Sequence, residues 1–237
     1  MQPHILITGS SRGIGAACAA ALTAAGARVV GHATRAAPGI LAADLALPGA
    51  GERLWVEALD CLDGRIDVLV NNAGVFEDAP LESPDWGSVW ERSLQINLQA
   101  AADLCRQAVL HFGDFREGGR GGRIVNVASR AAYRGDSPDH WHYAAAKAGM
   151  IGMTKTIARG YAARGVLAYA VAPGFVMTGM AESYLNSRGG EKILADIPLG
   201  RVATPEEVAE TVRWLALDAP ASLTGACLDV NGASFVR

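Results

Sequence analysis

The sequence predicts an α/β fold in which one doubly wound parallel sheet of seven strands carries helices on both faces. Short apolar runs alternate with helical patterns along the whole chain, and no repeat or low-complexity linker interrupts them. With 237 residues and 50% apolar composition, the chain is long enough to bury one large core. We therefore expect a single domain over residues 1–237.

Composition argues against several classes of function. The net charge is −3 and no basic run offers a surface to nucleic acid or to a membrane. No apolar run reaches the ~18 residues of a membrane span, and no charged leader opens the chain, so we expect a cytoplasmic protein. Cys18, Cys61, Cys105 and Cys227 lie far apart without metal-ligand spacing, which favours buried thiols and no metal site.

The first strand is expected at His4–Thr8, the first helix at Ala16–Ala25 and the second strand at Arg28–Ala33. The turn between strand and helix spaces its glycines as Gly-x-x-x-Gly-x-Gly. Glycines at such a turn let the backbone approach a pyrophosphate, and the following helix N-terminus attracts it. This pattern predicts a dinucleotide loop of a Rossmann fold, although many glycine-rich turns are only turns. The expected binding residues are Gly9, Ser11, Arg12, Gly13, Ile14 and Gly15.

The end of the second strand indicates which nucleotide is bound. A ribose 2′-hydroxyl favours an acidic residue there, whereas a 2′-phosphate needs cations. Thr34 and Arg35 stand at this position, and no acid follows until Asp44. With Arg12 as a second cation, we expect NADP(H) to be favoured over NAD(H); the alternative is that Arg35 is a solvated loop charge.

The next elements are shorter. Pro38–Gly39 predicts that the helix between strands two and three is reduced or absent, and Leu41–Leu45 reads as the third strand. A helix at Glu52–Leu62 and a buried strand at Ile66–Val70 follow. Polar residues just past a parallel strand lie where such sheets bind ligands, or else they only bond the local turn. The expected cofactor residues here are Asp44, which would contact the adenine amino group, Leu45, Asn72, Ala73 and Gly74.

A long helix is expected from Pro84 to about Phe112, with Asn97 in its middle, where propensity disfavours asparagine. A functional role or a solvent-facing side chain would explain this position. The fifth strand reads as Arg123–Ser129, and Ser129 at its carboxyl end would face the cleft.

Tyr143 and Lys147 lie four residues apart in a predicted helix that runs to about Ala163, so they share one face. A fixed ammonium would lower the pKa of the phenol and make it an acid–base. The alternative is a snorkelling lysine beside a half-buried ring.

The last part of the chain completes the sheet. Val166–Val171 reads as the sixth strand, and Ala226–Val230 as the seventh, after a helix that begins at Thr204–Pro205. Between them, Met180–Asp196 is amphipathic and suits a mobile lid, so we expect a lid over about 178–200. We place a cofactor-binding half at about 1–125 and a catalytic and substrate half at about 126–237.

Together these motifs resemble the short-chain dehydrogenase/reductase family over essentially the whole chain. The resemblance implies that Tyr143 is the acid–base, that Ser129 binds the substrate oxygen, and that Asn97 supports a proton-relay water. It implies that Lys147 holds the nicotinamide ribose and lowers the Tyr143 pKa, and that Thr178 contacts the carboxamide end of the cofactor. Further cofactor contacts implied by the family are Tyr143, Lys147, Pro173, Gly174, Val176 and Thr178.

Within that family, the chain is most similar to 3-oxoacyl-(acyl-carrier-protein) reductases, through Thr8–Gly15, Thr34–Arg35 and Pro198–Arg201. The likeness implies arginines near the cleft mouth that receive an acidic carrier, for which Arg120 and Arg164 are candidates. It also implies a homo-oligomer, a dimer or homotetramer, built on the helices around 89–112 and 143–163.

The sequence also departs from that pattern. Fourteen positions separate Ser129 from Tyr143, one more than is usual, and Gly179 replaces an acid often found after the threonine. The loop from Arg130 to His142 is polar and aromatic, and His140 and His142 are either substrate ligands or structural.

Three functions remain open at this point. The first is an NADPH-dependent reductase of a 3-oxoacyl thioester or a similar small ketone. The second is an NAD-dependent alcohol, sugar or cyclic-diol dehydrogenase. The third is a non-catalytic nucleotide-binding regulator, which has no chemical need for Ser129, Tyr143 and Lys147 together.

Overall fold

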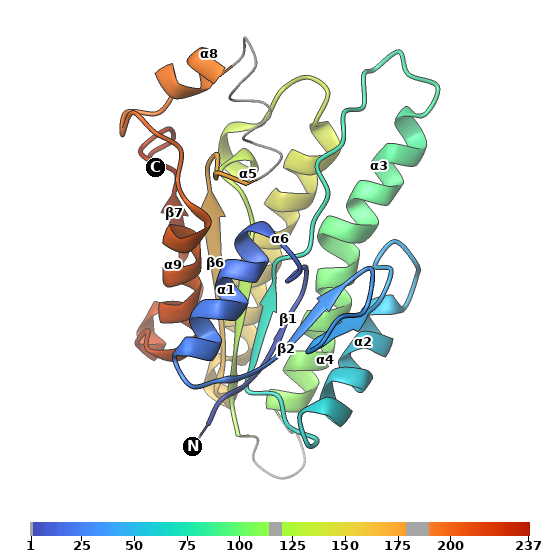
Figure 1. Cartoon of the computed structure of the whole chain (residues 1–237), viewed down its shortest axis with the longest axis vertical. Coiled ribbons are helices and arrows are strands. Elements are labelled where there is room, and N and C mark those ends of the chain that lie inside the picture. The colour runs from blue at the N-terminus through green and yellow to red at the C-terminus, as the bar shows by residue number, and fades with distance from the viewer. Residues whose placement is uncertain (1, 114–119, 179–189) are drawn as a thin grey trace.

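A computed structural model describes residues 2–113, 120–178 and 190–237, and its centre is one parallel sheet (Figure 1). The strand order is β3-β2-β1-β4-β5-β6-β7, and every neighbouring pair is parallel. This order reverses direction between β1 and β4, which confirms the predicted doubly wound sheet of seven strands. The strands are β1 (His4–Ile7), β2 (Arg28–Ala33), β3 (Ile40–Ala42), β4 (Val68–Asn71), β5 (Gly122–Val127), β6 (Val166–Pro173) and β7 (Cys227–Val230).

Helices cover both faces of the sheet (Figure 1). Successive strand residues point to opposite faces, so the apolar residues of a central strand are buried on both sides. Ile5 and Ile7 of β1 belong to a buried cluster with residues of α1 (Gly13–Ala24) and α9 (Pro205–Leu217). Leu6, between them, belongs to the cluster on the other face. That cluster includes residues of α2 (Ala50–Cys61), α4 (Ala100–Phe112) and α6 (Trp141–Tyr161).

The remaining described elements are short or interrupt longer ones. They are α3 (Trp86–Leu94), η1 (Gln95–Gln99), α5 (Ala131–Arg134), η2 (Ala162–Arg164), α8 (Gly190–Ala195) and η3 (Ala221–Leu223).

The structure refines three of the predicted elements. The expected long helix from Pro84 is α3 and α4 joined by η1, a π-helical segment that contains Asn97. β3 has three residues, and no helix precedes it, as Pro38–Gly39 predicted. Residues 179–189 of the predicted lid lie outside the described residues, whereas α8 falls within its range.

The helix α9 begins with the cap that its sequence predicts. The Thr204 hydroxyl accepts a hydrogen bond from Glu207 N at 3.3 Å, and the Glu207 carboxylate accepts one from Thr204 N at 2.8 Å. Pro205 follows at the first helical position, where its missing N–H costs nothing. Arg201 also binds Glu207, so the pKa of this carboxyl falls to about 2.

In the described parts of the chain, no helix is both long and apolar enough to cross a membrane. The same residues hold no group of three or more His, Cys, Asp or Glu side chains suited to a metal ion.

Candidate active site

The four predicted catalytic residues meet beyond the carboxyl ends of β4 and β5. Ser129 follows β5, Tyr143 and Lys147 lie on the first turns of α6, and Asn97 lies in η1. A Cβ on Gly74, after β4, would stand 2.7 Å from Asn97 Oδ1 and 3.6 Å from Lys147 Nζ. Lys147 Nζ lies 5.7 Å from the centre of the Tyr143 ring, and Ser129 is a hydrogen-bond partner of the phenol. The fold therefore gathers all four in one place.

Backbone geometry aims the Ser129 hydroxyl. Its oxygen accepts a hydrogen bond from Ala131 N at 3.1 Å, at the start of α5. With that lone pair used, its proton is available for the phenol oxygen of Tyr143 or for a substrate oxygen. The Ser129 contact lowers the pKa of Tyr143, as expected for a donor that stabilises the phenolate.

The pKa of Tyr143 lies above its ordinary value in this structure, whereas the sequence predicted that Lys147 would lower it. Burial raises the pKa of Tyr143 to about 12, against the smaller opposite effect of Ser129. Burial also lowers the pKa of Lys147 to about 8, and its Nζ donates to Val127 O at 2.8 Å. The ammonium is thus directed at a carbonyl and is itself desolvated. Tyr143 consequently stays protonated at neutral pH, as a proton donor must be.

Asn97 is fully buried, so the solvent-facing alternative is wrong. Its Oδ1 accepts from Val75 N at 2.8 Å, and its Nδ2 donates to Val75 O at 3.0 Å and to Ser93 Oγ at 2.9 Å. The amide therefore clamps the chain just after Gly74. The Asn97 side chain is thus committed to these partners, within the π-helical segment η1.

Sequence reasoning missed the support behind Asn97. Ser93 Oγ lies 2.9 Å from His142 Nδ1, in the residue before Tyr143. Ser93 Oγ can accept from Asn97 and still pair with either tautomer of His142. Burial lowers the pKa of His142, which favours the neutral imidazole. His142 is thus structural, and nothing in its spacing from Ser93 indicates the contact.

His140 and Phe76 form a wall beside Tyr143. The rings of Phe76 and His140 stack at 3.7 Å, and Phe76 meets the Tyr143 ring edge-on at 4.9 Å. His140 Nδ1 lies 2.6 Å from Ser137 Oγ, and its Nε2 lies 3.3 Å from Asp78 Oδ1. Phe76 is 39% exposed, so the wall presents an apolar face next to the phenol.

The glycine-rich loop fits a dinucleotide. Gly9 has a φ of +68°, and a Cβ on it would lie 2.8 Å from Ala73 Cα. A Cβ on Gly15 would lie 2.1 Å from Gly9 O, and one on Gly13 would lie 3.2 Å from Thr178 Cγ2. No side chain caps α1 at Arg12 and no acid occupies its first turn. The helix N-terminus thus offers its N–H groups to an anion, which a phosphate requires.

Asn72 fastens this loop to the end of β4. Its Nδ2 donates to Thr8 O and to Gly9 O, each at 3.0 Å. Thr8 Oγ1 accepts from the backbone N–H groups of Asn72 and Ala73, also at 3.0 Å. The two strand ends that the sequence assigned to the cofactor are therefore tied together.

The predicted cofactor residues at β2 and β3 divide into two groups. Arg12, Thr34, Arg35 and Asp44 are exposed. Asp44 Oδ1 accepts from Ala46 N at 3.0 Å, so one carboxylate oxygen serves this turn. Leu45 is 5% exposed and packs in the core, so its side chain does not face a ligand.

The predicted cofactor residues at the end of β6 and after it also differ in their surroundings. Pro173 and Val176 are buried, and Gly174 is needed because a Cβ there would lie 2.8 Å from Asn231 Cβ. Thr178 is the residue that reaches the glycine-rich loop, through Gly13. Of this group, Thr178 is thus the residue that lies beside the glycine-rich loop.

Arg120 and Arg164 do not lie near the cleft mouth of their own chain, which corrects the prediction. Arg120 precedes β5, Arg164 precedes β6, and Gly122 N donates to Gly165 O at 3.0 Å between these connections. The amino ends of parallel strands lie at the opposite edge of the sheet from the carboxyl ends that hold Ser129 (Figure 1).

Comparison with known proteins shows similarity over nearly the whole chain. A family model described as Enoyl-(Acyl carrier protein) reductase matches residues 9–233. The 3-oxoacyl-(acyl-carrier-protein) reductase of Synechocystis sp. is 42% identical over 248 residues, covering 96% of this chain and 94% of the relative. The protein of the same name from Vibrio cholerae is 38% identical, covering 98% and 96%. A solved structure of aldohexose dehydrogenase from Thermoplasma acidophilum has a TM-score of 0.86 at 28% identity, covering 100% and 95%.

Proposed function

The chain belongs to the short-chain dehydrogenase/reductase family of NAD(P)-dependent oxidoreductases, and from this we propose that it reduces a carbonyl with NADPH. The proposed substrate is a 3-oxoacyl thioester or a similar small ketone. The observation that carries the proposal is the protonated Tyr143 phenol, whose pKa the nearby Ser129 hydroxyl lowers, at the carboxyl edge of the sheet.

Each of these side chains has a task in the reduction. Bound NADPH supplies the hydride to the carbonyl carbon. Tyr143 gives its proton to the carbonyl oxygen as negative charge develops there, and Ser129 donates a hydrogen bond to the same oxygen. The phenolate left on Tyr143 is stabilised by the Ser129 hydroxyl and by the charge of Lys147.

Other residues position the cofactor and the site. We assign the pyrophosphate to the loop from Gly9 to Gly15, and the 2′-phosphate to Arg12 and Arg35, because no acid stands at the end of β2. Asn97 holds the Val75 backbone beside Gly74, and Thr178 adjoins the loop at Gly13.

Two partly exposed aromatic rings at this edge of the sheet favour an apolar or aromatic substituent near the carbonyl. Phe76 and Phe175, from the segments after β4 and β6, are 39% and 37% exposed. The curated relatives named above are reductases of 3-oxoacyl groups on acyl carrier protein, so an acyl thioester is the substrate we assign first.

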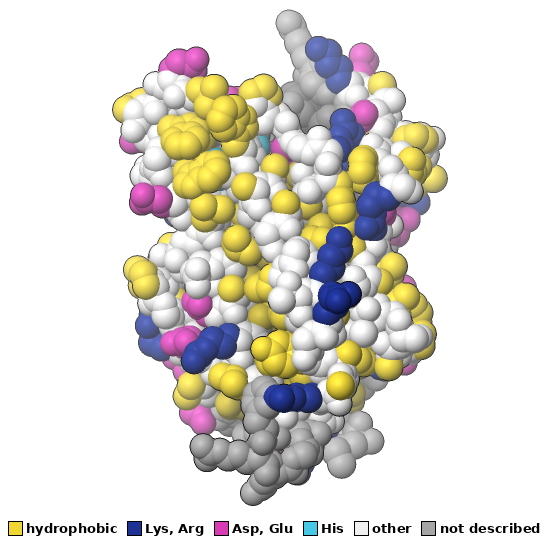
Figure 2. All heavy atoms as spheres, turned by 180° about the vertical axis from the view of Figure 1, so that it is seen from behind, with side chains coloured by type: hydrophobic (Ala, Val, Ile, Leu, Met, Phe, Trp, Pro, Cys, Tyr) yellow, Lys and Arg dark blue, Asp and Glu magenta, His cyan; other side chains and the backbone are white. Residues whose placement is uncertain are grey.

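A second copy is itself part of the proposal. Figure 2 shows hydrophobic side chains gathered at the end of the molecule where α3 and α6 begin. Trp86 and Trp90 stack there at 5.3 Å, and Trp141 is 52% exposed. We assign this face to a homo-oligomer, a dimer or tetramer, and we expect the protein to act in the cytoplasm as one domain.

The alternative is an NAD-dependent sugar dehydrogenase, favoured by the structural likeness to aldohexose dehydrogenase. In that direction Tyr143 would accept the proton of the alcohol as hydride leaves for the cofactor. The preference for NADPH or NADH separates the two functions.

The pH dependence of reduction tests this function. We expect kcat/KM for a 3-oxoacyl thioester with NADPH to be level at neutral pH and to decline through pH about 8, where Lys147 loses its proton. Tyr143 keeps its own proton up to about 12, so the decline reports Lys147. The measurement is NADPH oxidation across this pH range. Absence of turnover would contradict the proposed function. A profile that stays level beyond pH 9, about one unit above the pKa of Lys147, would contradict only the role of the Lys147 charge.

A further inference from the structure

His32 is a buried imidazole near the end of β2, between two segments assigned to the cofactor. It is 3% exposed, in a strand that is otherwise apolar or small at this end. Gly9 N lies 3.3 Å from its Nδ1, and Ala43 O lies 3.0 Å from its Nε2. The sequence alone does not indicate a role for this residue.

The two partners determine the state of the ring. A backbone N–H can only donate and a carbonyl can only accept, so Nδ1 is unprotonated and Nε2 carries the proton. His32 is therefore a neutral imidazole of one tautomer. Burial lowers its pKa, which keeps it neutral at physiological pH.

The backbone of the same residue holds the loop a second time. Ser10 N donates to His32 O at 2.9 Å, and His32 N donates to Ser10 Oγ at 3.1 Å. This approach requires Gly31, because a Cβ there would lie 2.2 Å from Ser10 Oγ. The glycine-rich loop thus rests directly on β2.

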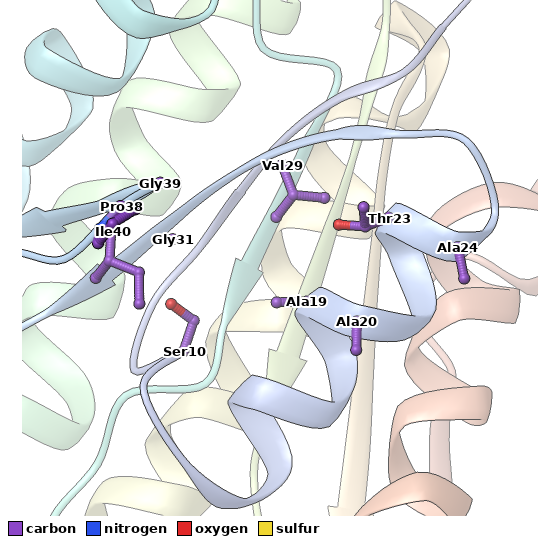
Figure 3. A pocket seen from close by; sticks show the side chains of 10 residues that line it. All are labelled: Ser10, Ala19, Ala20, Thr23, Ala24, Val29, Gly31, Pro38, Gly39 and Ile40. Atoms are coloured by element: carbon purple, nitrogen blue, oxygen red, sulfur yellow. The ribbon is translucent and has the colours of Figure 1, made fainter.

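The edge of the sheet beside His32, formed by β2 and β3, has no connecting helix packed on it. No helix joins β2 to β3, and Figure 3 shows the resulting hollow between α1 and the strands, about 570 Å³ in volume. β3 is held by strand pairing and by Gly31 N, which donates to Gly39 O at 2.8 Å. The bond from His32 to Ala43 adds a side-chain link just before Asp44.

We infer that His32 is a positioning residue of the nucleotide site. Its neutral ring sets the distance between the loop at Gly9, assigned to the pyrophosphate, and the turn at Asp44, assigned to the adenine. Holding both segments in place before binding removes an ordering cost from cofactor affinity. The inference rests on the proposed use of NADPH, and it concerns a residue that acts through the backbone of Gly9 and Ala43.

Two substitutions separate the two links. The Oδ1 atom of asparagine lies three bonds from Cα, as Nδ1 of histidine does. His32→Asn therefore keeps an acceptor for Gly9 N and loses the hydrogen bond to Ala43 O. The Nε2 atom of glutamine lies four bonds from Cα, as Nε2 of histidine does. His32→Gln therefore keeps a donor for Ala43 O and loses the hydrogen bond from Gly9 N. His32→Leu removes both links at similar volume.

The expected result is a graded loss of NADPH affinity, measured by the fluorescence of the reduced nicotinamide. His32→Leu weakens Kd about tenfold, His32→Asn restores most of that loss, and His32→Gln restores less. NADH follows the same order, because both nucleotides share the pyrophosphate. His32→Asn and His32→Gln each lose one ring hydrogen bond, so we expect similar thermal stability for these two.

The outcomes are distinguishable. If the unsubstituted protein binds neither NADPH nor NADH, the proposed function fails. If that protein binds and all three variants bind equally well, or if Kd follows thermal stability alone, the inference on His32 fails. Nitrogen NMR of the unsubstituted protein gives a check that needs no variant: a doubly protonated ring, or a proton on Nδ1, at neutral pH overturns it.

Discussion

Tyr143→Phe is expected to lower kcat for carbonyl reduction by about 10³-fold, within the range that a positioned general acid contributes. The substitution removes only the hydroxyl that protonates the substrate oxygen. The ring remains, and with it the edge contact with Phe76 at 4.9 Å. We therefore expect Kd for NADPH and thermal stability to change little, so that the loss appears in kcat. Steady-state kinetics and a cofactor titration on the same preparation measure both quantities.

Tyr169→Phe is the matched control. Tyr169 lies fully buried in β6, and its hydroxyl has no hydrogen-bond partner among the described residues. Removing that hydroxyl should leave kcat unchanged and should not reduce stability, because it takes away an unsatisfied polar group. Equal activity of Tyr143→Phe and the unsubstituted protein would show that another group delivers the proton.

Gly15→Ala is expected to weaken NADPH binding by at least about 100-fold and to lower thermal stability. The new Cβ would lie 2.1 Å from Gly9 O and 2.5 Å from Asn72 Nδ2. The first of these is backbone, so the loop itself has to move away from the N-terminus of α1. Calorimetry and fluorescence titration measure the two effects.

Gly160→Ala provides the comparison for a glycine without this constraint. Gly160 lies in α6, and a Cβ there would meet nothing within 4 Å. Alanine should stabilise the helix by about 1 kcal/mol and leave the Kd for NADPH unchanged. A Gly15→Ala protein that still bound NADPH normally would remove the loop from the cofactor site.

Much of the fold could be predicted because its signals are local. Strands that are buried on both faces appear as continuous apolar runs such as Ile5–Ile7 and Val68–Val70, and Pro38–Gly39 predicts the missing helix. Ser129 and Asn72 were found for a topological reason, since polar residues that follow parallel strands meet at one edge. The same rule, applied to Arg120 and Arg164, would have placed them at the opposite edge, because they precede their strands.

What could not be predicted depends on burial and on partners distant in sequence. The spacing of Tyr143 and Lys147 gives their shared face, but only the packed site shows that burial raises the pKa of the phenol and lowers that of the ammonium. His32 meets residues on two other strand ends, and His142 meets Ser93 on a different helix. No periodicity records such pairs. The π-helical turn at Asn97 likewise belongs to the packing of α3 and α4 against α6.

The central claim is that this oxidoreductase uses NADPH, and the most direct test is a titration of the purified protein with NADPH and, separately, with NADH. We expect NADPH to bind at least about tenfold more tightly, and Arg35→Glu to remove that preference by placing a carboxylate at the end of β2. Tighter binding of NADH by the unsubstituted protein would contradict the assignment of Arg12 and Arg35 to the 2′-phosphate and would favour the NAD-dependent sugar dehydrogenase.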